Sequence, residues 1–125
     1  MQNYRHLRVW RKAFALALSI REVTSRFPRG YAELRSQMTS AAESILFNIV
    51  EGCGASSSRE FARFLEIAIK STTELEGELE LAKAYGVVRE SAWILVSPET
   101  IDTRRMLIGL RKKVLQTDLS RSPSS

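Results

Sequence analysis

Apolar residues recur at steps of three and four along most of the chain, and this spacing predicts helices. The first helix is expected from about His6 to Arg26, with residues 1–5 loose or forming an entry strap. Its repeating apolar positions are Trp10, Ala13, Phe14, Ala17, Ile20, Val23 and Phe27. Pro28 disfavours helical dihedral angles at the residue before it and Gly30 supplies turn freedom, so the helix is expected to end there.

The second helix, expected from Tyr31 to Gly52 or Cys53, carries more than one apolar stripe. The first stripe is Leu34, Met38, Ala42, Ile45 and Ile49, and a third row is Leu46, Phe47 and Val50. Beside the first stripe runs a second, mixed stripe of Gln37, Ala41, Ser44, Asn48 and Glu51. A surface helix normally has one apolar stripe and one polar face. We therefore expect this helix to be covered by its own bundle and also by a further helix or another subunit.

The third helix shows a regular heptad of apolar positions. Ser57 with Glu60 three residues later is typical of a capping box at its start, and Gly86 is expected just past its end. The heptad positions are Phe61, Leu65, Ala68, Thr72, Leu75, Leu79 and Ala82, a spacing that favours nearly parallel packing of helices. The outer face is acidic, with Glu66, Glu74, Glu76, Glu78 and Glu80.

Residues 87–96 are expected to form a connector that holds at most a short helical turn. Ser97, Pro98 and Glu99 have the order of an N-cap, a first-turn proline and a dipole-stabilising carboxylate, so the fourth helix is expected from Ser97 to about Leu119. Its expected inward positions are Ile101, Leu107, Leu110 and Val114. The polar residues 120–125 predict a disordered tail.

Four helices with short connections predict the fold class: all-α, an antiparallel up-down-up-down four-helix bundle spanning residues 1–119.

Composition narrows the class of protein further. With 125 residues, 44% hydrophobic and 26% charged, the chain has the character of one ordinary globular domain. It holds no apolar run long enough for a membrane-spanning helix, and its basic start lacks the apolar segment of a secretion signal. The single cysteine, Cys53, cannot form an internal disulfide bond, which fits a reducing cytoplasm.

The net charge of +5 is unevenly distributed. Residues 1–35 hold 8 Lys or Arg and 2 Asp or Glu, giving +6; residues 36–88 hold 4 and 8, giving −4; residues 89–125 hold 7 and 4, giving +3. Basic residues of the terminal helices are therefore candidates for phosphate contacts with RNA or DNA. These candidates are Arg8, Arg11, Lys12, Arg104, Arg105, Arg111, Lys112 and Lys113. The alternative is that these charges form solvated faces balanced between neighbouring helices.

The polar positions of the second helix are the candidates for an assembly function. Gln37, Ser44, Asn48 and Glu51 share one side of that helix, where they could line a pocket or a central pore. The alternative is a hydrogen-bond network that fixes the register between helices or subunits. The acidic third helix is a candidate to meet a basic helix of a neighbouring subunit, a contact between unlike surfaces of the kind that closes rings.

Nothing in the sequence has the spacing of a catalytic or metal site. A di-metal bundle site needs inward carboxylates with a Glu-x-x-His motif, whereas His6 is the only histidine. Cys53 has no base near it in sequence, and Ser56 to Ser58 are explained by a loop and a cap. We therefore expect no enzyme activity, cofactor, metal or small-molecule substrate.

Several short motifs together resemble a known family, the four-helix-bundle proteins encoded in intervening sequences of bacterial 23S rRNA genes, also called S23 ribosomal proteins. The most specific matching run is Ala41 to Ile45 continuing into Asn48 to Gly52. The other matching pieces are Leu7 to Trp10, Phe27-Pro28, Leu34 with Gln37, Glu60-Phe61, Phe64-Leu65, Ala68, Ser71, Glu74 to Glu76, Leu81-Ala82, Tyr85-Gly86, Met106-Leu107 and Leu110. The resemblance extends over about residues 4–116.

This resemblance implies a ring of five bundles, and one branch of the family is a basic pentameric accessory factor to a reverse transcriptase and its RNA. It therefore implies a homopentamer, for which the charge of one chain scales to roughly +25. Two hypotheses about function follow from the sequence. The first is a pentameric bundle that binds RNA or DNA, alongside a partner protein; the alternative is a protein–protein scaffold with no nucleic-acid role.

Overall fold

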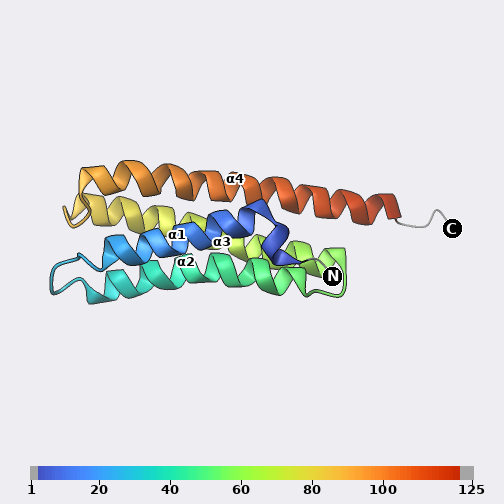
Figure 1. Cartoon of the computed structure of the whole chain (residues 1–125), viewed down its shortest axis with the longest axis horizontal. Coiled ribbons are helices and arrows are strands. Elements are labelled where there is room, and N and C mark those ends of the chain that lie inside the picture. The colour runs from blue at the N-terminus through green and yellow to red at the C-terminus, as the bar shows by residue number, and fades with distance from the viewer. Residues whose placement is uncertain (1–2, 122–125) are drawn as a thin grey trace.

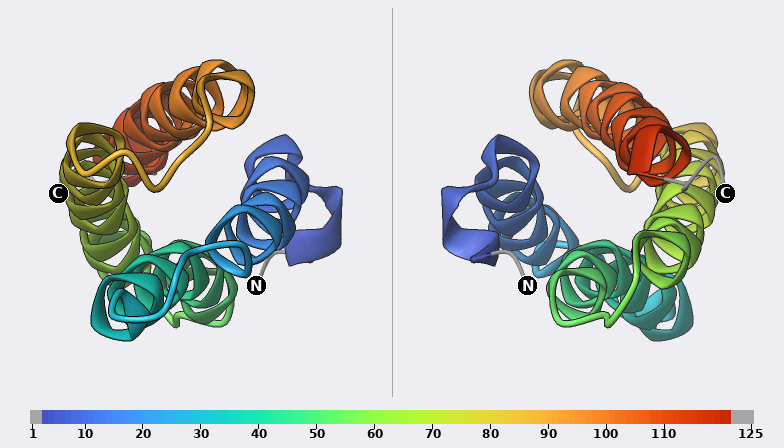
Figure 2. Two further views of the ribbon diagram at one scale, coloured as in Figure 1. Left: turned by 90° about the vertical axis from the view of Figure 1, so that its left-hand side faces the viewer. Right: turned by 90° about the vertical axis from the view of Figure 1, so that its right-hand side faces the viewer.

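The computed structural model describes the backbone of residues 3–121 and the side chains of residues 3–117. A short 3-10 helix, η1 (Tyr4–His6), is followed by α1 (Arg8–Thr24), α2 (Ala32–Cys53), α3 (Ser58–Ala84) and α4 (Glu90–Arg121). Successive helices run in opposite directions (Figure 1). Seen end-on, they follow one another around the bundle in chain order, and α1 also contacts α4 (Figure 2). The all-α four-helix bundle predicted from the sequence is confirmed, and residues 3–121 contain no strand.

The four helices differ in length, so the bundle is uneven along its axis. The helix α1 has 17 residues and α4 has 32, or about 25 Å and about 48 Å at the usual rise per residue. The short helix η1 precedes α1 and packs against the bundle. Leu7, between η1 and α1, adopts an extended backbone conformation, and η1 contacts both α1 and α2. Of the two alternatives for residues 1–5, a loose segment or an entry strap, Tyr4 and Arg5 follow the second, and residues 1–2 lie outside the described residues.

The junction between α2 and α3 is close because a glycine stands at the contact. A Cβ atom added to Gly52 would lie 2.7 Å from Cδ1 of Phe61 and 3.3 Å from Cβ of Phe64. The helix α3 begins beside this contact, where Oγ of Ser57 accepts a hydrogen bond from the backbone N–H of Glu60 at 3.1 Å. The Glu60 carboxylate accepts a hydrogen bond from Oγ of Ser56 at 3.2 Å. The Ser57 half of the predicted capping box is therefore present, whereas the Glu60 carboxylate bonds to the hydroxyl of Ser56.

The end of α3 is also as predicted. Gly86 has a φ of +76°, a left-handed conformation that glycine adopts without strain. The N–H of Gly86 donates to the carbonyl of Lys83 and the N–H of Val87 to that of Ala82, at 2.9 and 3.1 Å. These two bonds satisfy carbonyl groups at the helix end in the Schellman pattern.

The start of α4 differs from the prediction. The helix begins at Glu90, seven residues before Ser97, and Pro98 lies inside it. A proline there removes one backbone hydrogen bond, the one to the carbonyl of Ile94, and both residues lie on the exposed side of the helix. Packing of the preceding turns favours the longer helix, because Val96 is buried and Lys83 Nζ lies 4.4 Å from the ring centroid of Trp93. The helix continues to Arg121, so it includes the first two residues of the predicted tail, whereas residues 122–125 lie outside the described residues.

The core is formed by the predicted stripes of α2 and α3, by part of the predicted stripe of α1 and by an unexpected side of α4. On α1, Ala13 and Ile20 are buried as predicted, whereas the predicted inward residue Phe14 is exposed. The other buried residues of α1 were not predicted; they are Val9, Leu16 and Thr24.

The heptad of α3 is buried, except that Phe61 is half-buried. On α4 the buried side chains include Thr100 and Thr103, whose hydroxyls donate to the carbonyls of Val96 and Glu99, each at 2.7 Å. Because these hydroxyls are satisfied within their own helix, threonine can occupy the core at these positions. The predicted inward residues Ile101, Leu110 and Val114 are only half-buried, whereas Leu107 is buried.

Candidate nucleic-acid interface

Lys12 of α1 lies against α4. Its Nζ is 2.8 Å from Oε2 of Glu99 and 3.8 Å from Oδ2 of Asp102. Two carboxylates of α4 therefore surround the ammonium group, and its charge is offset within the chain. This contact helps to hold α1 beside α4 and leaves Lys12 a poor candidate for phosphate contacts.

Arg104 and Arg111 of α4 turn towards α3, although the sequence placed both on an outward face. Arg104 forms an ion pair with Glu76. In Arg111, Nε donates a hydrogen bond to the carbonyl of Ala62 at 3.2 Å, and Nη2 lies 3.7 Å from Oε2 of Glu66. The two arginines are seven residues apart, or about two helical turns, so they reach the same neighbour. The acidic residues of α3 thus meet basic residues of α4 in the same chain.

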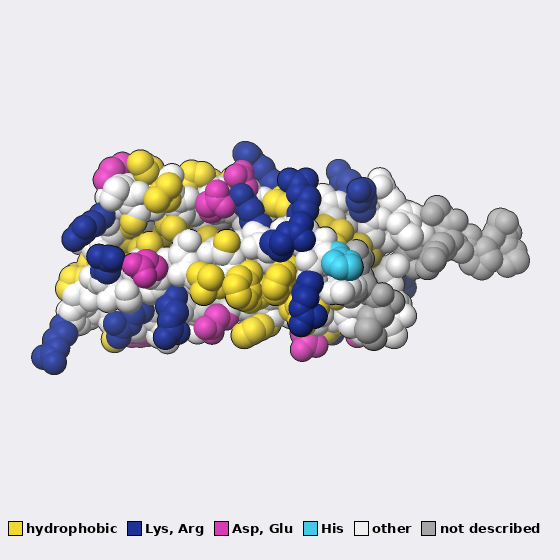
Figure 3. All heavy atoms as spheres, in the orientation of Figure 1, with side chains coloured by type: hydrophobic (Ala, Val, Ile, Leu, Met, Phe, Trp, Pro, Cys, Tyr) yellow, Lys and Arg dark blue, Asp and Glu magenta, His cyan; other side chains and the backbone are white. Residues whose placement is uncertain are grey.

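The other five candidates remain exposed. They are Arg8, Arg11, Arg105, Lys112 and Lys113. Nη1 of Arg11 donates to the carbonyl of Arg5 at 3.0 Å, and no carboxylate of the described side chains lies within ion-pair distance of any of the five. Figure 3 shows lysine and arginine side chains gathered where the start of α1 lies beside α4. These five residues form the candidate phosphate-binding surface.

Two of the four predicted assembly residues take part in a hydrogen-bond network with α3. Oγ of Ser44 lies 2.8 Å from Oγ of Ser71. The Nδ2 group of Asn48 donates to the carbonyl of Ser44 at 2.8 Å and to its Oγ at 3.1 Å. Gln37 and Glu51 are exposed, and neither side chain bonds to another described residue. Ser71 belongs to the network but was not among the predicted assembly residues.

Ser44 and Asn48 are half-buried, and none of the other described helices covers the outer side of the α2–α3 pair (Figure 2). From Ser71, further residues follow at steps of three and four along the same side of α3. We call this surface the α2–α3 face; it comprises Gln37, Ser44, Phe47 and Asn48 of α2 and Ile67, Ser71, Glu74, Glu78 and Leu81 of α3. Phe47 is 59% exposed, and Ile67 and Leu81 are also exposed. The face is therefore polar along its centre, with large apolar side chains beside it.

Within the α2–α3 face the carboxyl group of Glu78 is perturbed. Burial, together with the neighbouring Glu74 carboxylate, raises the pKa of Glu78 from its ordinary value of 4.5 to about 7. Oε1 of Glu78 is buried and receives no hydrogen bond from a described donor. Near neutral pH this carboxyl group therefore exchanges between its neutral and charged forms.

The remaining titratable candidates form no site. His6 is exposed in η1, and Cys53 is buried at the end of α2, where burial raises the pKa of its thiol. Within residues 3–117, no three His, Cys, Asp or Glu side chains lie together in a way that would hold a metal ion.

None of the described helices has the length and apolar character needed to cross a membrane.

Comparisons with known proteins agree with the arrangement of these helices. The crystal structure of a protein of unknown function from the S23 ribosomal protein family, from Bacteroides thetaiotaomicron VPI-5482, matches the fold with a TM-score of 0.77. That match has 24% sequence identity and covers 83% of this chain and 98% of the other. A search of curated proteins finds no match. The family model of the 23S rRNA-intervening sequence protein matches residues 5–109. The chain therefore belongs to the 23S rRNA-intervening sequence protein family.

Proposed function

We propose that this protein is a non-enzymatic, oligomeric bundle that binds RNA or DNA through phosphate contacts. The observation that carries the proposal is the set of five exposed basic residues on α1 and α4 that have no carboxylate partner. Contacts of this kind need no particular base sequence, because the phosphate backbone supplies a uniform line of negative charge. The match to a family encoded in intervening sequences of 23S rRNA genes is consistent with a nucleic-acid ligand.

The proposed assembly is a homo-oligomer that uses the α2–α3 face, with a ring of five as the expected form. The support is that this face exposes Phe47 beside the half-buried hydrogen bonds of Ser44, Asn48 and Ser71. A second chain covering the face would bury apolar side chains and exclude water from the network, which strengthens its hydrogen bonds. Oligomerisation would also multiply the positive charge presented to a polyanion.

The test is a gel-shift titration of the protein with a structured RNA over a range of salt concentrations. A variant with Arg105→Gln, Lys112→Gln and Lys113→Gln is compared with a control that removes three exposed cations elsewhere, namely Arg29→Gln, Arg35→Gln and Lys70→Gln. We expect wild-type affinity to fall steeply with salt. The α4 variant should lose about two to three units of the slope of log affinity against log salt concentration, because each phosphate contact contributes about 0.7 to 0.9.

The alternative is a protein–protein scaffold with no nucleic-acid role. It is favoured by the use of Lys12, Arg104 and Arg111 inside the bundle, where their charge stabilises helix contacts. Absence of RNA binding at low salt, or an equal loss of slope in the α4 variant and its control, would support this alternative and reject the phosphate-binding surface.

A further inference from the structure

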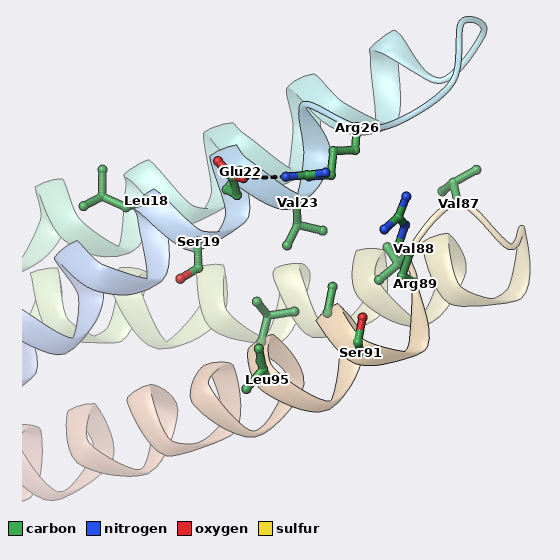
Figure 4. A pocket seen from close by; sticks show the side chains of 12 residues that line it. Leu18, Ser19, Glu22, Val23, Arg26, Val87, Val88, Arg89, Ser91 and Leu95 are labelled. Carbon is green, nitrogen blue, oxygen red and sulfur yellow. Dashed lines mark hydrogen bonds and ion pairs between the residues drawn. The ribbon is translucent and has the colours of Figure 1, made fainter.

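A groove of about 610 Å³ lies between the second half of α1 and the first half of α4, apart from the surfaces discussed above. Figure 4 shows it bounded by α1 on one side and by α4 and the turn before it on the other. Its lining residues fall into three groups: small side chains, large apolar side chains and charged residues at the rim.

The groove exists because small side chains face it from both helices. Ser19 of α1 and Ser91 and Ala92 of α4 line it, and none of them is long enough to fill the space between the two helices. Val88 and Val96 in the lining are buried, so part of the groove surface belongs to the hydrophobic core.

Two large apolar side chains stand at the opening of the groove. Leu18 on α1 is 59% exposed and Leu95 on α4 is 68% exposed. In Figure 4, Val23 extends from α1 and Leu95 lies on α4 across the groove from it. An alkyl group lying in the groove would cover part of the apolar surface of these side chains, which is favourable in proportion to the apolar area buried.

The rim carries an excess positive charge at one end. Arg26 forms an ion pair with Glu22 at 3.0 Å, so these two charges offset each other. Arg89 is exposed and no carboxylate of the described side chains lies within ion-pair distance of it. Arg26 and Arg89 both lie towards the Val87 end of the groove (Figure 4). The unpaired guanidinium group at that end matches an anionic group, and a carboxylate fits its planar donor geometry.

We propose that this groove binds a single-chain fatty carboxylate, with the carboxylate at Arg89 and the alkyl chain along Leu18, Val23 and Leu95. The lining supplies one unpaired cation and two hydroxyl groups, those of Ser19 and Ser91, and is otherwise mainly apolar. This division corresponds to a ligand with one charged head and a long apolar tail. The volume lies in the range of about 300 to 1,000 Å³ that small-molecule sites occupy.

The first test is a calorimetric titration of the full chain with sodium dodecanoate below its critical micelle concentration. Hexanoate keeps the head group and shortens the tail, and dodecyltrimethylammonium keeps the tail and reverses the charge. We expect saturable binding of dodecanoate and binding weaker by about tenfold or more for each comparison ligand. No saturable binding of dodecanoate, or equal binding of the cationic amphiphile, would overturn the proposal.

The second test locates the site with matched variants. Arg89→Glu and Leu95→Gln should each weaken dodecanoate binding by about tenfold. Their controls are Arg105→Glu, which makes the same charge change elsewhere on α4, and Ile94→Gln, which changes a neighbouring apolar side chain that is 59% exposed and outside the groove. All four positions are exposed, so circular dichroism should show unchanged helix content. If the controls weaken binding as much as the groove variants, the amphiphile binds elsewhere and the proposal fails.

The outcome is independent of the proposed nucleic-acid function. Arg105→Glu removes one of the candidate phosphate contacts, so it should reduce the salt dependence of RNA binding while leaving dodecanoate binding unchanged. Arg89→Glu should weaken dodecanoate binding in the same way whether or not the protein binds RNA. Failure of either proposal is therefore distinguishable from failure of the other.

Discussion

Glu78 is a residue whose protonation is linked to folding. Its pKa of about 7 in the folded chain exceeds its ordinary value of 4.5, so the folded state holds the proton more tightly than the unfolded state. The resulting stabilisation is fully present below the lower of these pKa values and is lost as the pH rises through about 7. Folding stability should therefore decline as the pH rises between these two limits.

Replacing Glu78 with glutamine should remove this decline, because the amide does not titrate. Between about pH 5 and about pH 8 we expect Glu78→Gln to lose less stability than the wild type, by on the order of 1 kcal/mol after allowance for solvent screening. Urea unfolding at several pH values measures the difference. Glu80→Gln, an exposed change on the same helix, is the control and should keep the wild-type dependence. A parallel decline in the wild type and Glu78→Gln would contradict the linkage.

At the scale of single residues, the sequence predicted the buried side of α2 and α3 better than it predicted the partners of individual side chains. The spacing of Ser44 and Asn48 placed them on one stripe, and both are in one network. Their partner Ser71 depends on the register between α2 and α3, which periodicity does not determine. The same limit explains Arg104 and Arg111: their ion pairs require α3 and α4 to align in a way that no local pattern encodes.

Among the elements, α4 is the one for which local signals and the structure disagree. The predicted bounds of the first helix lie within two residues of α1, and the predicted starts of the second and third helices lie within one residue of α2 and α3. For α4, the Ser-Pro-Glu run has the form of a helix start, yet it lies inside the helix. Burial of Val96 and packing of Trp93 outweigh the single backbone hydrogen bond lost at Pro98. Tertiary packing of this kind is not visible in a local motif.

Replacing Pro98 with alanine tests this view of α4. An alanine in a helix interior restores the missing hydrogen bond, so we expect Pro98→Ala to raise the free energy of unfolding by about 1 to 3 kcal/mol. Chemical denaturation monitored by circular dichroism measures the change. Pro28→Ala, an exposed proline in the turn between α1 and α2, is the control, and it should be neutral or destabilising. A destabilised Pro98→Ala variant would indicate that the helix starts at Pro98.

For the whole molecule, the fold class followed from the sequence, whereas the surfaces between helices did not. Four apolar stripes joined by short turns imply a bundle. The groove beside Leu95 depends on how far α1 and α4 stand apart and on which small side chains face the space between them, and neither is encoded in a local pattern. The exposed α2–α3 face was anticipated more directly, because α2 carries more apolar and polar stripes than one bundle can cover.

Assembly of the whole molecule should respond to a change in that face. The amide of Asn48 bonds to Ser44 beside the exposed Phe47, so Asn48→Leu should change the mass or the stability of the oligomer while helix content persists. Light scattering at micromolar concentration measures the mass. Arg35→Leu is the control, because Arg35 is exposed about 140° around α2 from Asn48 and about 120° from Phe47. A wild-type mass near the 14.2 kDa of one chain would exclude the oligomer itself.

The position of Cys53 has a practical consequence for the study of motion. Its thiol is buried directly after Gly52, at the close junction of α2 and α3, and burial raises its pKa. Alkylating reagents react with an accessible thiolate, so modification has to wait until the end of α2 opens. The chain thus carries a single cysteine as a chemical probe at this junction. The rate of its labelling, divided by the rate for an exposed cysteine, gives the equilibrium constant of local opening there without any substitution.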